Sequence, residues 1–291
     1  MARLKILKHR HLIQALGATM FNSNFKGFFE GNIYKGNLKS VCIPVLNCYS
    51  CPGAIFSCPI GSLQAVENST KFSLSFYILG LMGLFGILAG RFFCGYLCPF
   101  GFFQDLLYKI KVKKFKLPKK ASKVLSLLKY FILAIMVFLL PILLSSPTKI
   151  SDPYFCKYLC PSGTIFGGIP LALRNVQIRN AIGSLFFYKL TIAILIIVLS
   201  IILYRFFCRY LCPLGAFLGI FNPISFYRLS VSHNCIDCKK CQAKCKFDIP
   251  TYKTPNSPEC IRCNDCVKVC PVGAIKAGVK HDDERDYSAN L

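Results

Sequence analysis

Long apolar runs separated by short polar segments occupy the first two thirds of the chain. Three of them approach the roughly 20 residues that a helix needs to cross a bilayer, at residues 72–90, 122–144 and 185–204. A fourth run, 11–29, is apolar at first but carries Asn22, Asn24 and Lys26. It either spans the bilayer or lies at its surface, and a cleaved signal peptide is the alternative. The pattern predicts a mainly α-helical membrane protein with about four transmembrane helices.

Cysteine motifs accompany these runs in a repeated order. RFFCGYLCPFG at 91–101 and RFFCRYLCPLG at 205–215 each follow an apolar run and place two cysteines four residues apart, on one face of a helical turn. A CPxG element lies upstream of each run, at 58–61 and 160–163. The chain is therefore predicted to contain two pseudo-repeats, each made of an outer CPxG, a span and an inner RFFCxYLCPxG.

Pairing of the pseudo-repeats would gather four thiols at the inner face. These are Cys94, Cys98, Cys208 and Cys212. Thiolates suit a [4Fe–4S] or [2Fe–2S] centre, whereas cysteines that only pack the bundle are the structural alternative. The repeated spacing with proline and glycine favours ligation.

Six more thiols lie in the two loops at the opposite face. They are Cys42, Cys48, Cys51, Cys58, Cys156 and Cys160, and all six are candidate metal ligands. The predicted ligands of a possible further cluster are Cys51, Cys58, Cys156 and Cys160. Disulfide bonds compete with this prediction because that side of a membrane is often oxidising.

The C-terminal part contains two C-x2-C-x2-C-x3-C runs, which in bacterial ferredoxins bind a pair of [4Fe–4S] clusters. In that arrangement the fourth cysteine of each run ligates the other cluster. One predicted ligand set is Cys235, Cys238, Cys241 and Cys270, and the other is Cys260, Cys263, Cys266 and Cys245. Structural zinc prefers separated cysteine pairs, so iron–sulfur is favoured.

These patterns divide the chain into three parts. Residues 1–230 form the predicted membrane domain, 231–280 a small α+β ferredoxin-like domain with two [4Fe–4S] clusters, and 281–291 a charged, disordered tail.

The net charge of +24 is concentrated on one side of the predicted membrane. Nine lysines lie from Lys109 to Lys129, and more basic residues lie at the N-terminus. This is the pattern of a cytoplasmic face. We therefore expect a multi-pass protein of the cell inner membrane with a cytoplasmic ferredoxin-like domain. Its basic residues should attract lipid headgroups and not nucleic acid.

The motifs resemble those of the membrane-bound polyferredoxin family, which includes NapH-type subunits and the iron–sulfur parts of NosR-type and CcoG-type proteins. The resemblance rests on RFFCGYLCPFG, RFFCRYLCPLG, CIDCKKCQAKC and CIRCNDCVKVCP. It implies four or more spans, a cytoplasmic pair of clusters, and electron transfer between a quinol or cytosolic donor and an acceptor at or across the membrane. The outer NCYSCPGAIFSCPIG and FCKYLCPSG exceed the two CxxxCP motifs usual in NapH-type proteins, so quinol oxidation does not follow automatically.

The predicted function is membrane-integral electron transfer, as a component of an oxidoreductase system and without catalytic residues of its own. Clusters at both faces would divide a bilayer core of about 30 Å into shorter steps. Expected partners are a cytoplasmic ferredoxin, flavodoxin or flavoprotein, or a quinone, together with a partner redox subunit. The alternative is a metal-handling or maturation factor whose outer cysteines bind or reduce a soft metal such as copper.

Overall fold

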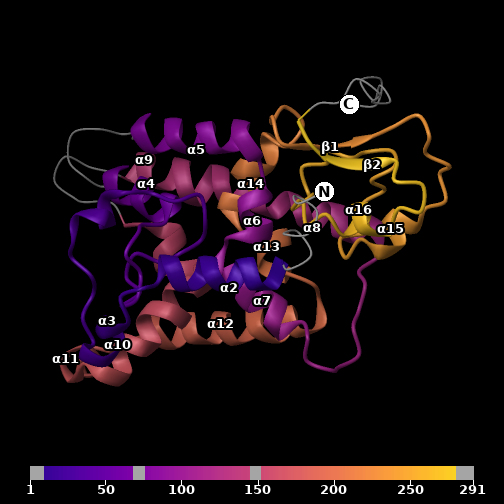
Figure 1. The fold of residues 1–291 in the computed structure, drawn as a ribbon. Coiled ribbons are helices and arrows are strands. Elements are labelled where there is room, and N and C mark those ends of the chain that lie inside the picture. The colour runs from indigo at the N-terminus through magenta and orange to yellow at the C-terminus, as the bar shows by residue number, and fades with distance from the viewer. Residues whose placement is uncertain (1–9, 68–75, 145–151, 280–291) are drawn as a thin grey trace.

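The structure, a computed structural model, describes residues 10–67, 76–144 and 152–279. The first part of the predicted span 72–90 and the predicted tail 281–291 lie outside these ranges. The described chain is mainly helical, with one two-stranded sheet near its C-terminal end. A helical body and a smaller cysteine-rich tail unit lie next to each other (Figure 1).

Two helices are long and apolar enough to cross a membrane. One is the continuous helix Lys119–Leu144, of 26 residues, and the other is α12 (Ser184–Ile202), of 19 residues. α5 (Phe76–Ala89) is apolar over its 14 described residues. Large side chains such as Phe76, Leu195 and Val198 remain exposed on these helices, as expected where lipid covers them.

The segment predicted as the first span is interrupted. α2 (Arg10–Phe21) has 12 residues and is followed after a break by α3 (Phe25–Glu30). The polar residues that follow α2 account for the break, because Asn22 bonds back to Ala18 O and Asn24 to Pro52 O. The number of membrane crossings therefore stays a prediction.

Short helices connect these long ones and hold the cysteine motifs. The long helix comprises α8 (Lys119–Ile132), the π-helical η2 (Leu133–Leu139) and α9 (Leu140–Leu144). The others in the helical body are η1 (Asn37–Ser40), α4 (Pro59–Glu67), α6 (Phe92–Tyr96), α7 (Pro99–Leu107), η3 (Phe155–Leu159), η4 (Gly163–Gly168), α10 (Ile169–Arg174), α11 (Val176–Asn180), α13 (Phe206–Tyr210) and α14 (Pro213–Ile220).

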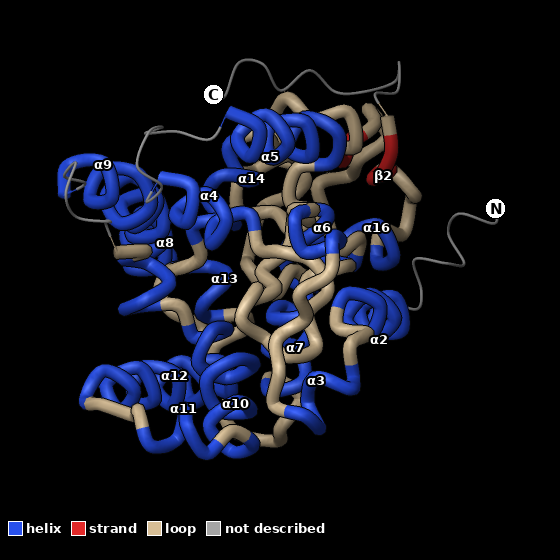
Figure 2. The backbone as a smooth tube through the Cα atoms, turned by 90° about the vertical axis from the view of Figure 1, so that its left-hand side faces the viewer, coloured by secondary structure: helices blue, strands red, loops and turns tan. Residues whose placement is uncertain are grey.

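The two pseudo-repeats pack across each other. α7, which follows the first inner motif, packs against α12, the long helix of the second repeat. α14, which follows the second motif, packs against α5 of the first repeat and against α8. The motif helices are thus central to the body, and the longer helices surround them (Figure 2). This crossed packing brings the two inner motifs together.

The tail unit is built from two strands and two short helices. β1 (Arg228–Val231) pairs antiparallel with β2 (Ile275–Gly278), and α15 (Lys240–Lys244) and α16 (Asp265–Val269) lie between them in sequence. Leu229 and Val231 of the first strand are fully buried in the small core of this unit. The strand pair begins at Arg228, slightly before the boundary expected at residue 231.

Close backbone contact holds the tail unit against the first inner motif. A Cβ atom added at Gly95 would lie 2.3 Å from Ile261 O, so only glycine fits at this position. The neighbouring Tyr96 donates its hydroxyl to Cys263 O at 3.2 Å. The tail unit is therefore packed directly on the first RFFCxYLCPxG motif.

An ion-pair cluster makes a second connection. Glu259 of the tail unit reaches Lys129 of α8 at 2.5 Å and Arg91 at 3.5 Å, and both cations are fully buried. A side chain at Gly219 would prevent this approach, because its Cβ would lie 2.8 Å from Pro258 O. Glycine at this position of α14 lets an acid from the tail unit neutralise cations of the helical body.

We predict that Gly95→Ala weakens docking of the tail unit. The added methyl group would overlap Ile261 O, and overpacking of this kind costs about 1–3 kcal/mol. The expected result is faster proteolytic separation of the tail unit in detergent and a lower thermal midpoint.

Gly80→Ala on α5 is the matched control, since an added Cβ there meets no atom within 4 Å. It should leave both measurements unchanged, or raise the midpoint slightly because alanine favours helix. Equal proteolysis of the two variants would contradict the predicted contact.

Candidate metal centres

Four Cys-Pro pairs in the helical body share one local geometry. In each, proline is the first residue of a helical segment, and the cysteine before it occupies the N-cap position; the pairs start at Cys58, Cys98, Cys160 and Cys212. Proline in these pairs thus begins a new helical segment. The N-terminus of a helix favours negative charge on the cysteine sulfur.

Glycine three residues after each of these cysteines completes the geometry. The amides of Gly101 and Gly215 donate to Cys98 Sγ and Cys212 Sγ at 3.4 Å each. Equivalent bonds run from Gly61 and Gly163 to the outer cysteines Cys58 and Cys160. Amide bonds to the sulfur stabilise a thiolate and tune the potential of a bound cluster.

The inner cysteines converge as the pseudo-repeat predicts. Cys94, Cys98, Cys208 and Cys212 are all at least nine-tenths buried. Burial, together with the nearby sulfurs of the same set, raises the pKa of the Cys98 thiol to about 12. Burial likewise raises the pKa of Cys208 to about 11, although Gln104 Nε2 donates to its sulfur at 3.0 Å. Ionisation of Cys98 and Cys208 is therefore favoured by a bound cation, and four cysteine sulfurs are the donor set of a [4Fe–4S] cluster.

Two buried arginines connect the repeats around the inner cysteines. Arg91 of the first motif donates to Cys208 O at 3.1 Å, and Arg205 of the second donates to Cys94 O at 2.6 Å. Each arginine thus binds the backbone of the other repeat's first cysteine. Both side chains are fully buried, so each places positive charge next to the sulfurs.

The acid that pairs with each arginine comes from a different source. Asp105 of α7 accepts two bonds from Arg205, at 2.8 and 2.7 Å, and further bonds from Arg10 and Gln14. The equivalent position in the second repeat is Gly219, so Arg91 pairs instead with Glu259 of the tail unit. The inner site is therefore complete only when the tail unit is docked.

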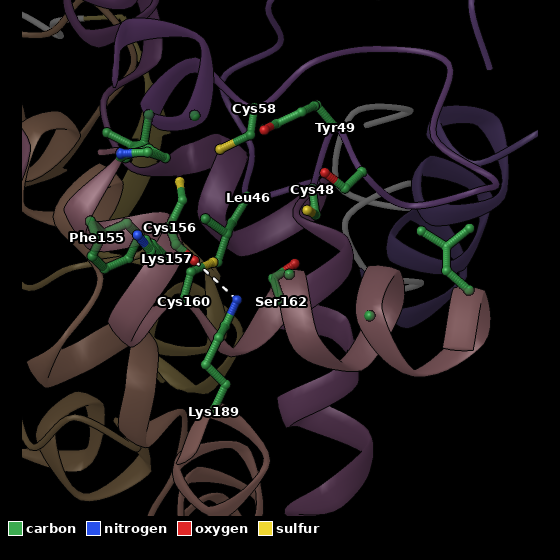
Figure 3. A pocket seen from close by; sticks show the side chains of 17 residues that line it. Leu46, Cys48, Tyr49, Cys58, Phe155, Cys156, Lys157, Cys160, Ser162 and Lys189 are labelled. Atoms are coloured by element: carbon green, nitrogen blue, oxygen red, sulfur yellow. Dashed lines mark hydrogen bonds between the residues drawn. The ribbon is translucent and has the colours of Figure 1, made fainter. Parts of the chain in front are cut away.

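The outer cysteines form a second group around a cavity of about 360 Å³ (Figure 3). Its sulfur-bearing lining residues are Cys48, Cys58, Cys156 and Cys160. Lys189 of α12 extends toward them and donates to Cys156 O at 3.2 Å. Burial raises the pKa of both Cys58 and Cys160 to about 12.

The other two outer cysteines lie outside this cavity lining. Cys51 Sγ contacts Asn22 Oδ1 at 3.7 Å, and Cys42 forms a β-bridge with Ser57. The sequence-based ligand set contained Cys51, whereas the structure places Cys48 in the cavity. None of the eighteen cysteines forms a disulfide bond.

One short stretch of chain separates the inner and outer sets. Leu46 lines the outer cavity, and its backbone also hydrogen bonds to Cys98 of the inner set. Cys48 follows two residues later. The first outer loop therefore extends down to the inner site, and the two sets lie close together.

The tail cysteines are arranged in the two crossed sets that their spacing predicts. One small pocket is lined by Cys235, Cys238, Cys241 and Cys270. In the second set, Cys266 lies near Cys260, Cys263 and Cys245, and burial raises its pKa well above the usual value with help from these sulfurs. Both groupings match the exchange of fourth cysteines between runs.

Backbone geometry supports this arrangement. Asp237 and Lys239 in the first run, and Arg262 and Asn264 in the second, have φ between 51° and 60°. These residues occupy equivalent places in the two runs and adopt a conformation that costs non-glycine residues energy. It directs backbone amides toward sulfur, as where Arg262 N donates to Cys260 Sγ at 3.4 Å.

Among the described residues, no group of three His, Cys, Asp or Glu side chains is arranged to hold a single metal ion. A cluster keeps its ligating sulfurs further apart than one ion does, because each sulfur binds a different iron atom. The four cysteine sets are therefore suited to clusters by their donor chemistry, burial and amide bonds.

Comparison with known proteins supports the same chemistry. A family profile described as a 4Fe-4S binding domain matches residues 70–118, 130–176 and 185–228, and a second profile with that description matches 255–276. The uncharacterized protein MJ0750 of Methanocaldococcus jannaschii is 35% identical over 192 residues, which are 65% of this chain and 72% of that protein. No solved structure matches the chain.

Two further relatives have informative names. YccM of Escherichia coli, named as an electron transport protein, is 26% identical over 226 residues, 75% of this chain and 58% of its own length. The regulatory protein NosR of Stutzerimonas stutzeri is 26% identical over 193 residues, 62% of this chain and 23% of its own. The chain thus spans little more than half of YccM and under a quarter of NosR.

The helical body, its apolar helices and the cysteine sets define a membrane iron–sulfur protein of the electron-transfer class. The chain belongs to the NosR/NapH-like iron–sulfur family.

We predict that Asp105→Asn destabilises the protein by about 3–5 kcal/mol, because it leaves the buried Arg205 without its acid and Arg10 with only the more distant Asp265, at 3.8 Å. The arginines hold the pKa of Asp105, against its burial, well below the usual 3.8. Its stabilising effect is therefore complete above about pH 5 and is lost as the pH falls further. Thermal unfolding in detergent should show a deficit of similar size throughout the range from about pH 5.5 to 8.

Glu30→Gln is the control, since the Lys26–Glu30 pair is exposed. It should change the midpoint little. A deficit in Asp105→Asn that disappears toward pH 5.5 would show that Asp105 is protonated there and would contradict the prediction.

Proposed function

We propose that the protein conducts electrons through four [4Fe–4S] clusters, two in the tail unit and two in the helical body. The observation that carries this proposal is the gathering of sixteen of the eighteen cysteines into four sets of four. Cys42 and Cys51 are the two that remain. Each set has the thiolate donors that such a cluster requires.

The contacts between sets define an order. Cys238, in the set farthest from the helical body, is exposed and can meet a soluble carrier. The Cys260 set follows, and its Cys263 O accepts the hydroxyl of Tyr96, which lies two residues after Cys94 of the inner set. Leu46 then connects the inner and outer sets. One or two residues thus link the sets at each of the last two steps, and at the first step Cys241 lies near Cys266.

Buried positive charge would support clusters in the helical body. Arg91 and Arg205 flank the inner set, and Lys189 lies beside the outer set. Thiolate clusters carry negative charge that burial makes costly. These three cations offset that cost and would shift the cluster potentials upward.

The orientation follows from the distribution of basic residues. Lysines of the 109–129 segment lie at the same end of the body as the tail unit, which supports a cytoplasmic tail unit in an inner membrane. An acidic cytoplasmic carrier such as a ferredoxin, flavodoxin or flavoprotein, or a quinone, would exchange electrons there. A partner redox subunit would meet the outer cysteines.

The test is the iron and acid-labile sulfide content of protein purified anaerobically in detergent, with low-temperature EPR. Four clusters require about 16 iron atoms per chain. Changing one ligand should remove one cluster, so Cys94→Ser and Cys160→Ser should each lower the count by about 4. Cys48→Ser should do the same, because Cys48 lines the outer cavity.

Cys42→Ser and Cys51→Ser are the matched controls and should retain the full iron content. A wild-type count of about 8 would restrict the clusters to the tail unit and overturn the path through the membrane. In that case, the metal-handling alternative would be favoured if added copper protected the outer cysteines from an alkylating reagent.

A further inference from the structure

A large cleft lies between the tail unit and the helical body. Its volume is about 710 Å³, within the range of small-molecule sites. Its walls come from the loop before α8, from α8 and α13, and from the segment of the tail unit that includes Cys245. Of the cysteines assigned to the four sets, Cys245 lines this cleft.

The cleft arises from a difference between the two pseudo-repeats. In the first, Gly95 allows Ile261 of the tail unit to pack on the motif. The equivalent position in the second is Arg209, which lines the cleft. The following tyrosines differ in the same way, because Tyr96 bonds to the tail unit whereas Tyr210 pairs with Ser122 of α8 in the cleft wall. The tail unit covers the first motif and leaves the second open.

Arg209 lies next to two aromatic rings, and only part of its hydrogen-bonding capacity is used within the protein. Its guanidinium lies 5.3 Å from the ring centre of Tyr210 and 5.1 Å from that of Phe247. Nη2 donates to Phe247 O at 3.0 Å, whereas Nε is buried and has no hydrogen-bond partner. A guanidinium held between rings offers both a planar stacking surface and donors for an anion.

The rest of the lining has the same two properties. Lys116, Lys119 and Lys123 contribute positive charge along the loop and α8, and Tyr108, Tyr130 and Tyr204 contribute aromatic rings. The two acids of the lining already have partners, since Asp248 faces Lys119 at 3.8 Å and Glu259 pairs with Lys129. The cleft therefore has an excess of positive charge and several aromatic surfaces.

We propose that this cleft binds a planar aromatic ligand that carries a phosphate group, of the flavin mononucleotide class. The phosphate would bind Arg209 and the lysines by charge-assisted hydrogen bonds, and the ring would stack on the aromatic side chains. Cys245, a ligand of a proposed cluster, also lines the cleft. A role for the ligand in electron transfer rests on the proposed function, whereas binding itself does not.

The test is a fluorescence titration of full-length, iron-loaded protein in detergent with flavin mononucleotide. We expect saturable quenching of the flavin at one site per chain. Arg209→Gln should weaken binding about tenfold or more, because it removes the charged donor. Riboflavin, which lacks the phosphate, should bind more weakly by a similar factor. Lys120→Gln is the matched control, since Lys120 is exposed on α8 but does not line the cleft, and it should bind as the wild type does.

Several outcomes would overturn the inference. These are the absence of saturable binding, equal binding by wild type and Arg209→Gln, and tighter binding of menadione, a neutral quinone ring. Equal affinity for riboflavin would show that the phosphate is not recognised. Displacement of flavin mononucleotide by short-chain phosphatidylglycerol, with the lipid binding more tightly than the flavin, would show a lipid headgroup site instead. Iron content of each sample separates the two proposals, because full iron without flavin binding contradicts only this inference, and missing iron contradicts the proposed function.

Discussion

The exchange of arginines between the two pseudo-repeats is the interaction on which the rest of the structure depends. Arg91 and Arg205 each bind the carbonyl of the first cysteine in the opposite motif, so neither motif can hold its position alone. A buried guanidinium is tolerated only when its donors and its charge are satisfied. The crossed packing of α7 on α12 and of α14 on α5 places both arginines where this is possible.

The charge balance around these arginines determines how the tail unit is attached. Arg205 finds Asp105 within the helical body, whereas Arg91 finds Glu259 in the tail unit. Gly219 occupies the place that corresponds to Asp105 and leaves room for the incoming loop. The two motifs have thus diverged in the source of this acid, because Arg205 pairs within the helical body and Arg91 pairs with the tail unit. The Arg91–Glu259 ion pair, which completes the inner site, also holds the tail cysteines next to that site.

The same divergence explains the two surfaces at this end of the body. Glycine at position 95 permits backbone contact with the tail unit, and arginine at position 209 keeps the equivalent surface open as a basic, aromatic cleft. The tail unit therefore covers one motif closely and forms a wall of the cleft beside the other. The difference between Gly95 and Arg209 thus decides which motif contacts the tail unit and which borders the cleft.

The sequence by itself determined the features that depend on local spacing. The spacing of the two tail runs predicted two groups of four cysteines that exchange their fourth member. The matching inner motifs predicted that Cys94, Cys98, Cys208 and Cys212 would lie together. Both predictions follow from spacing and repetition, which are visible along the chain. The apolar runs likewise indicated a helical membrane protein, which the long helices Lys119–Leu144 and α12 support.

Only the tertiary structure decided the features that depend on distant segments. It placed Cys48 and not Cys51 in the outer cavity, broke the 11–29 segment into two helices, and brought Glu259 to Arg91. Proline- and glycine-rich loops have no periodicity that fixes which cysteine points inward, and an ion pair between residues far apart leaves no mark in spacing. Packing of the two repeats and the tail unit against one another settles these choices.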